Sequence, residues 1–163
     1  MSPESPVNHP QSPAVPESER PSGGAVSVGI VLVSHSRALA EAAMDLARRL
    51  IVAVDVPVEP AAGLADGGLG TDPGTVVEAV ERLAERCEGV LVLADLGSGI
   101  MSAEMALEML DPALAERTRL SAAPFVEGLL GAYGAAGIGK DLQAVAAEAD
   151  GAAEAKRSQV AAF

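Results

Sequence analysis

Aromatic side chains are scarce in this chain, which has no tryptophan, one tyrosine and two phenylalanines. Hydrophobic residues still make up 49% of the 163 residues, so the core must consist of aliphatic side chains and methionine. Surfaces that bind bases or sugars by stacking need exposed aromatic rings. The composition therefore argues against a protein that recognises its ligand by stacking.

Basic residues are also few, with 11 Lys and Arg against 23 Asp and Glu and a net charge of −12. Nucleic-acid binding needs clustered Lys and Arg that contact phosphates, so this balance argues against it. The sequence has no apolar run of about 18 residues, and its start lacks the basic and then apolar pattern of a secretion signal. We therefore expect neither a nucleic acid nor a membrane as a partner.

Cysteine occurs only once, at Cys87, so no disulfide can form within the chain. This composition favours a reducing compartment, and we expect a cytoplasmic protein. A helix is predicted over residues 73–88, and it begins either with Asp72 as cap and Pro73 as first residue or with a capping box at Thr75. Cys87 falls on the apolar stripe of this helix. We interpret Cys87 as a core residue rather than a nucleophile.

The chain divides into a tail, a domain and a second tail. Residues 1–25 are rich in proline, serine and glutamate and contain His9, and this composition is typical of a disordered segment. Residues 26–150 are long enough for one domain. Residues 151–163 are alanine-rich and polar, and we expect a flexible C-terminal tail there.

Short apolar runs alternate with helical patterns between these tails. The predicted strands cover residues 26–33, 51–60, 90–94 and 119–122, and the predicted helices cover residues 37–50, 73–88, 98–110, 124–137 and 140–150. Such alternation predicts an α/β fold, with a mainly parallel sheet covered by helices on both faces. We expect a single four-stranded sheet in the order 2-1-3-4.

Polar residues follow the first and third strands, where an open parallel sheet binds its ligands. In the order 2-1-3-4 these strands are neighbours, so His35 and Asp95 would face one crevice. A carboxylate that is hydrogen-bonded to one ring nitrogen leaves the other as a nucleophile. The helix starts after Ser36 and Ser98 offer free N–H groups to a phosphoryl group. The alternative is that His35 is an ordinary polar loop residue without a function.

These residues thus predict an imidazole, His35, that faces an anion-binding cleft, with Asp95 as the group that orients its ring. The glycine-rich stretch "GLADGGLGTDPGT" either contributes a nest of N–H groups near the crevice or forms a mobile loop. We expect no metal in this site. The predicted supporting residues are Ser34, Ser36, Gly97, Ser98 and Thr71.

Four stretches, "VLVSHSRALAE", "GTDPGTVVEAVE", "VLVLADLGSGIMSAEMALEML" and "RLSAAPFVEGLLGA", resemble the DhaM family. These proteins are phosphotransferase subunits of the bacterial dihydroxyacetone kinase driven by phosphoenolpyruvate (PEP). Their domain is similar to the IIA domain of mannose-type sugar phosphotransferase systems. The resemblance covers about residues 26–150, and its most specific parts are "ADLGSGIMSAEMALEML" and "SAAPFVEG".

The resemblance implies that His35 takes a phosphoryl group from phospho-HPr and passes it to ADP held by a partner subunit, DhaL. The ATP formed there then phosphorylates dihydroxyacetone bound to DhaK. It also implies that Asp95 orients the imidazole and that the domain forms a homodimer. ADP and Mg²⁺ would belong to DhaL, so this chain needs no cofactor of its own. HPr would be a separate protein.

Two other functions stay open. One is a IIA component of a mannose-type sugar transporter, which relays phosphate to a IIB protein; the stretches "LGSGIMSAEMALEML" and "APFVEG" favour the kinase subunit instead. The other is a non-catalytic regulatory module of the same fold.

Three further patterns have structural interpretations. The stretch "GAAGIGKD" nearly matches a P-loop, but Asp141 replaces the hydroxyl residue that binds magnesium, and the stretch follows a helix instead of a strand. A turn between two helices, with Asp141 as the cap of the second, fits better. Glycines recur every third residue over residues 128–137, which predicts close approach of another helix, within the subunit or across a dimer. Met101, Met105 and Met109 form a stripe that predicts core or dimer packing.

Overall fold

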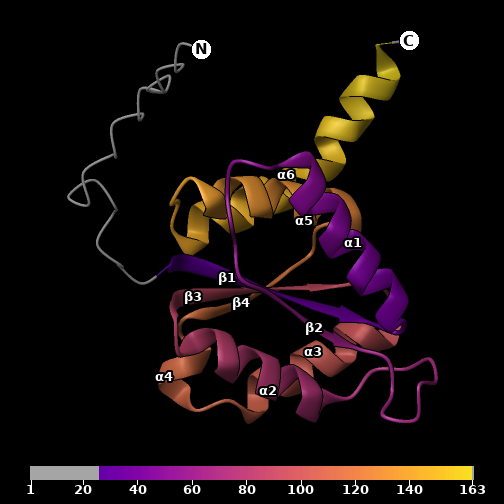
Figure 1. The fold of residues 1–163 in the computed structure, drawn as a ribbon, viewed down its shortest axis with the longest axis vertical. Helices are drawn as coiled ribbons and strands as arrows, with labels where there is room; N and C mark the ends of the chain where they lie inside the picture. The colour runs from indigo at the N-terminus through magenta and orange to yellow at the C-terminus, as the bar shows by residue number, and fades with distance from the viewer. Residues whose placement is uncertain (1–25, 163) are drawn as a thin grey trace, which may run out of the picture.

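A computed structural model describes residues 26–162, so the tail expected over residues 1–25, with His9, lies outside the described residues. Strands and helices alternate along the described chain (Figure 1). The elements are β1 (Val26–Ser34), α1 (Arg37–Leu50), β2 (Val58–Ala62), α2 (Pro73–Ala84), β3 (Cys87–Ala94), α3 (Gly97–Met109), α4 (Pro112–Ala115), β4 (Thr118–Ser121), α5 (Phe125–Gly137) and α6 (Leu142–Ala161).

The four strands form one parallel sheet in the order β2-β1-β3-β4, which confirms the predicted topology. Strand β1 lies between β2 and β3, and its Val33 pairs with Ala61 on one side and Ala94 on the other. The strand order reverses between β1 and β3. Ligand sites of open parallel sheets lie at such a reversal, beyond the carboxyl ends of the strands.

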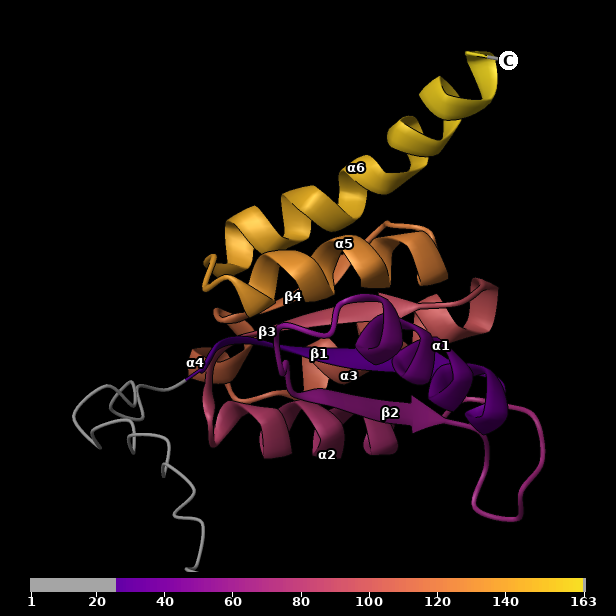
Figure 2. The same cartoon turned by 45° about the horizontal axis from the view of Figure 1, so that its top comes forward.

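Helices cover both faces of the sheet, as expected (Figures 1 and 2). Helices α1, α5 and α6 pack on one face, and α2, α3 and α4 pack on the other. Successive side chains of a strand point to opposite faces, so Ile30 and Leu32 enter the first core whereas Val31 and Val33 enter the second. Burial on both faces explains why the strand is a continuous apolar run.

The helix predicted over residues 73–88 is shorter in the structure. Asp72 caps α2 by accepting a hydrogen bond from the Thr75 N–H, but the helix ends at Ala84. The Arg117 guanidinium donates to the carbonyl oxygens of Ala84 and Cys87, which joins the helix end to the start of β3. Cys87 is therefore a buried strand residue, so the core interpretation is confirmed and the helical placement is wrong.

The last helix is longer than the predicted residues 140–150, so its predicted end is wrong, while the flexible tail expected over residues 151–163 stays a prediction. Helix α6 continues to Ala161 and extends beyond the body of the domain (Figure 2). Most of its residues are alanine or long polar side chains, which have high helix propensity. Lys156 also pairs with Glu127 of α5. The domain boundaries at residues 26 and 150 stay predictions.

The glycine and methionine patterns have different outcomes. A Cβ atom at Gly131 would lie 2.9 Å from the Glu148 carbonyl oxygen of α6, so the predicted close approach of another helix is confirmed there, within the chain. Met101, Met105 and Met109 are 62%, 53% and 60% exposed along α3, so core packing is wrong. Dimer packing of this stripe stays a prediction.

Candidate functional site

The site forms where β1 and β3 end side by side. The Asp95 N–H donates to the Val33 carbonyl oxygen at 3.0 Å, which extends the pairing one residue beyond β3. Ser34 and His35 follow Val33 on the neighbouring strand. The sheet register therefore places Asp95 directly against these two residues, and the predicted approach of His35 and Asp95 is confirmed.

The Asp95 carboxylate accepts four hydrogen bonds. Its Oδ2 atom accepts from Ser34 Oγ and from the His35 backbone N–H, both at 2.9 Å. Its Oδ1 atom accepts from His35 Nδ1 at 2.9 Å and from the Leu96 N–H at 2.7 Å. Burial of the side chain favours the neutral acid, but these donors together outweigh it and hold the pKa of Asp95 below its ordinary value. Asp95 is therefore a carboxylate at neutral pH.

This carboxylate determines the tautomer of His35. A carboxylate only accepts hydrogen bonds, so Nδ1 must carry the proton, and Nε2 of the neutral ring holds the free electron pair. The His35 side chain is 26% exposed whereas that of Asp95 is 6% exposed. The ring thus has a fixed inner edge and a reachable outer nitrogen, which is the arrangement of a nucleophile with a buried orienting group.

Ser98 lies at the outer edge of the ring, with its Oγ 2.5 Å from His35 Nε2. In this tautomer the Ser98 hydroxyl donates to Nε2. Helix α3 begins one residue earlier, at Gly97, and Leu96 provides no side-chain cap. The first N–H groups of an uncapped helix stay available to an anion. The structure therefore places Ser98 against His35 Nε2, and it places the start of α3, with its predicted N–H donors, beside the same ring nitrogen.

Two of the predicted supporting residues have other contacts. Ser34 is fully buried and donates to Asp95, so it supports the carboxylate. Ser36 Oγ accepts from the Leu39 N–H and caps α1. The start of α1 is therefore already occupied by its own side-chain cap, unlike the start of α3.

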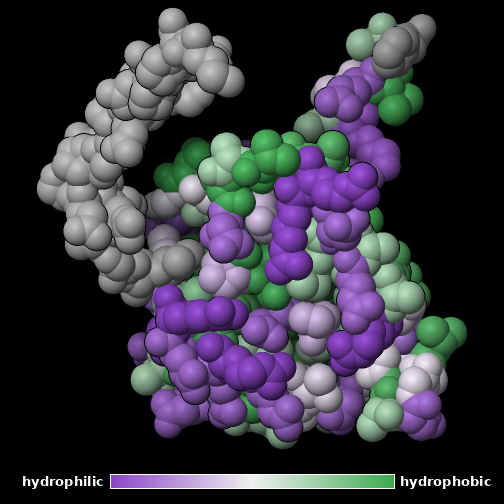
Figure 3. Space-filling model, viewed as in Figure 1, coloured by the Kyte–Doolittle hydropathy of each residue, from purple (hydrophilic) through white to green (hydrophobic). Residues whose placement is uncertain are grey.

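The glycine-rich loop between β2 and α2 is attached to the site at one end. The Gly70 N–H donates to the His35 carbonyl oxygen at 2.9 Å. Thr71 Oγ1 lies 2.8 Å from Ser102 Oγ and 3.4 Å from the Ser98 carbonyl oxygen, so Thr71 contacts α3. The outer end of the loop exposes hydrophobic surface (Figure 3), including Leu69 at 76% exposure.

Sequence reasoning missed one residue of the site, Gly99. A Cβ atom there would lie 2.7 Å from Asp95 Oδ1 and 3.6 Å from His35 Cε1, so only glycine leaves room for the carboxylate. A glycine inside a helix costs about 1 kcal/mol relative to alanine. That cost, at the second residue of the helix predicted over residues 98–110 beside the site, is the signal that could have identified it.

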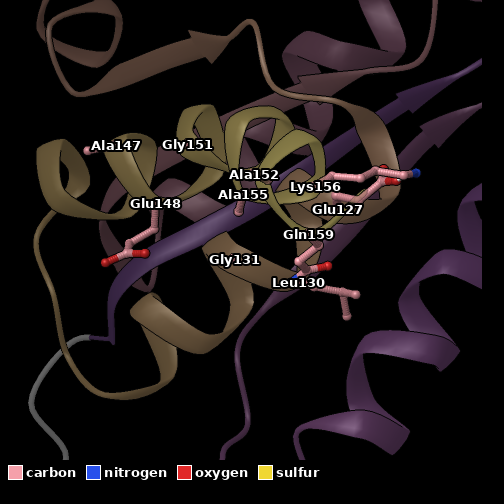
Figure 4. Close-up of a pocket in the computed structure, with 10 residues that line it drawn as sticks. All are labelled: Glu127, Leu130, Gly131, Ala147, Glu148, Gly151, Ala152, Ala155, Lys156 and Gln159. Carbon is pink, nitrogen blue, oxygen red and sulfur yellow. The ribbon is translucent and has the colours of Figure 1, made fainter. Parts of the chain in front are cut away.

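The region that resembles a P-loop lies elsewhere and is a turn between helices. Helix α5 ends at Gly137, and Asp141 caps α6 by accepting from the Ala144 N–H, as predicted. A groove runs between α5 and α6, where the Lys156 and Glu127 side chains lie side by side (Figure 4). None of the predicted site residues lines this groove.

No helix among the described residues is both long and apolar enough to span a membrane.

Comparisons with known proteins define the family. A family profile described as "PTS system fructose IIA component" (EIIA-man) matches residues 29–146. The chain therefore belongs to the EIIA-man family. It also resembles the crystal structure of a protein of unknown function, EF1359, with a TM-score of 0.70 and 31% identity, over 76% of this chain and 93% of that one.

Curated relatives within this family are named as phosphoryl donor subunits DhaM of PEP-dependent dihydroxyacetone kinases. Those of Klebsiella michiganensis and Escherichia coli are each 44% identical over 135 residues, which cover 82% of this chain and 28% of the relative. A Listeria innocua relative is 37% identical over 62% of this chain and 79% of its own length. The resemblance to DhaM is thereby confirmed, although the chain spans little more than a quarter of the first two relatives.

Proposed function

We propose that this chain is the phosphoryl carrier of a PEP-dependent dihydroxyacetone kinase, with His35 as the residue that is phosphorylated. The observation that supports this most is the contact between His35 Nδ1 and Asp95 Oδ1, which leaves the electron pair on Nε2 of a ring whose side chain is 26% exposed. The names of the DhaM relatives support the same function.

In the first step, the Nε2 electron pair attacks the phosphorus of phospho-HPr. The Nε2–P bond forms as the N–P bond of the donor histidine breaks, and the donor ring keeps the electron pair of that bond. The Ser98 hydroxyl must rotate away from Nε2 to admit phosphorus, and it can then donate to a phosphoryl oxygen. The N–H groups at the start of α3 lie beside it, and such donors stabilise the transferring oxygens.

In the second step, the β-phosphate oxygen of ADP attacks the phosphoryl group, the Nε2–P bond breaks, and Nε2 recovers its electron pair. ADP and Mg²⁺ are held by the acceptor subunit, DhaL, and the ATP formed there serves DhaK. Positioning of the two reactants supplies most of the catalysis of such transfers. We also propose that the carrier is a cytoplasmic homodimer.

The test is transfer of label from radioactive PEP through enzyme I and HPr. We expect the wild-type protein to be labelled and the His35→Gln variant to stay unlabelled. The label on the wild-type protein should be lost in mild acid and retained in alkali. Equal labelling of both proteins, or of neither, would contradict the proposal. Label that survives acid and is lost in alkali would indicate a phosphoserine instead.

The choice of acceptor separates the kinase subunit from a sugar-transport IIA component. Labelled protein should lose its phosphoryl group to ADP-loaded DhaL and not to a IIB protein. The reverse result would assign the chain to sugar transport.

A further inference from the structure

A hollow of about 460 Å³ borders Asp95 at the carboxyl ends of β3 and β4. Its walls come from α3, through Ile100 and Glu104, and from the turn between β4 and α5, through Ala122 and Pro124. Asp95 also contacts the ring of His35 through Nδ1, so the hollow borders the carboxylate that supports the proposed phosphoryl acceptor.

The hollow joins the two stretches that are most specific to the DhaM resemblance. These stretches, residues 94–110 and 121–128, are separate in the sequence, yet they supply every lining residue except Leu120. The resemblance of these stretches to DhaM also favours transfer of the phosphoryl group to ADP over transfer to a IIB protein. The kinase subunit and the sugar-transport IIA component share the phosphorylated histidine and differ in the acceptor. A surface built from these two stretches is therefore suited to recognising the acceptor.

The chemistry of the walls indicates what binds there. Ile100 is 42% exposed and lines the hollow together with alanine and proline side chains, while Asp95, Ser121 and the exposed Glu104 supply its polar side chains. Neither stretch contains Lys or Arg, and Glu104 forms no ion pair within the described chain. A largely apolar lining with an exposed, unpaired glutamate complements an apolar side chain flanked by basic residues.

We propose that this hollow is the docking site of the ADP-holding acceptor subunit, which inserts an apolar side chain and places a Lys or Arg against Glu104. The inference depends on the proposed function, because it concerns the partner of the same histidine.

The test compares Glu104→Lys with Glu108→Lys. Both residues are exposed glutamates of α3, one turn apart, and only Glu104 lines the hollow. Protein labelled on His35 is isolated and mixed with increasing concentrations of ADP-loaded acceptor subunit. We expect Glu104→Lys to lower the second-order rate constant at least tenfold, to leave the rate at saturating acceptor within twofold, and to leave labelling by phospho-HPr unchanged. Glu108→Lys should stay within twofold of wild type.

A second variant, Ala122→Trp, fills the hollow without changing charge and should slow the same step. Equal effects of the two glutamate variants, wild-type transfer by Glu104→Lys, or an equal loss of labelling by phospho-HPr would overturn the docking site. Dissociation of a dimer by Glu104→Lys with transfer unchanged would overturn it too. Failure of labelled wild-type protein to transfer to ADP would instead refute the proposed function.

Discussion

Replacement of Gly99 by alanine tests whether the contact between His35 and Asp95 determines reactivity. The added Cβ would lie 2.7 Å from Asp95 Oδ1, closer than side chains pack, so the carboxylate or the start of α3 must shift. The same Oδ1 atom accepts from His35 Nδ1 and from the Leu96 N–H. The substitution therefore disturbs the orientation of the ring without removing either partner.

The expected increase in activation free energy exceeds the expected loss of stability. A misplacement of about 1 Å at a reacting group costs on the order of 100-fold in rate, or about 2.7 kcal/mol of activation free energy. Alanine gains about 1 kcal/mol over glycine in a helix, while overpacking costs about 1–3 kcal/mol. We therefore expect Gly99→Ala to change the free energy of unfolding by at most about 2 kcal/mol.

The measurement is the initial rate of His35 labelling from radioactive PEP with excess enzyme I and HPr, together with a thermal unfolding curve. Gly151→Ala is the control, because it also adds a methyl group inside a helix but meets no atom within 4 Å. It should label at the wild-type rate. If Gly99→Ala also labels at the wild-type rate, the orientation of the ring by Asp95 does not limit the reaction.

Two further predictions follow from the same structure. The pKa of Asp95 is depressed in the folded state, so the carboxylate stabilises the fold above the ordinary pKa of 3.8, and this stabilisation is lost as the pH falls through the folded pKa. Denaturant titrations at decreasing pH should therefore show a smaller loss of unfolding free energy for Asp95→Asn than for wild type. Met105→Glu places a charge in the exposed methionine stripe of α3 and should convert a dimer to a monomer in light scattering, whereas an unchanged mass would place any dimer contact elsewhere.

The sheet was predictable because its signal is repeated along the chain. Each of the buried strands β1 and β3 is an apolar run followed by a polar turn, and both signals agree with the same parallel topology. The end of α2 was not predictable from periodicity, because the apolar spacing of the helix continues through Cys87 into the strand. The hydrogen bonds of Arg117, thirty residues later, close the helix end instead.

The sequence predicted the central pair of the site, His35 and Asp95, but not the contacts of the residues around this pair. His35 and Asp95 follow neighbouring strands, so their approach depends only on strand order. The separate contacts of Ser34 and Ser36 depend on local backbone direction, which residue type does not reveal. The requirement for Gly99 depends on a distance of 2.7 Å to Asp95 Oδ1, which no sequence pattern specifies.

A phosphoryl carrier needs one atom that two proteins can reach and a support that neither of them disturbs. The His35 side chain is 26% exposed, whereas Asp95 is 6% exposed and Ser34 is fully buried. The donors to the carboxylate come from the end of β1, the residue that follows it and the turn after β3, so the pairing of Val33 with Ala94 determines their positions. A shift of one residue would turn the side chains of a strand to the opposite face, so the register that buries the core also aligns His35 with Asp95.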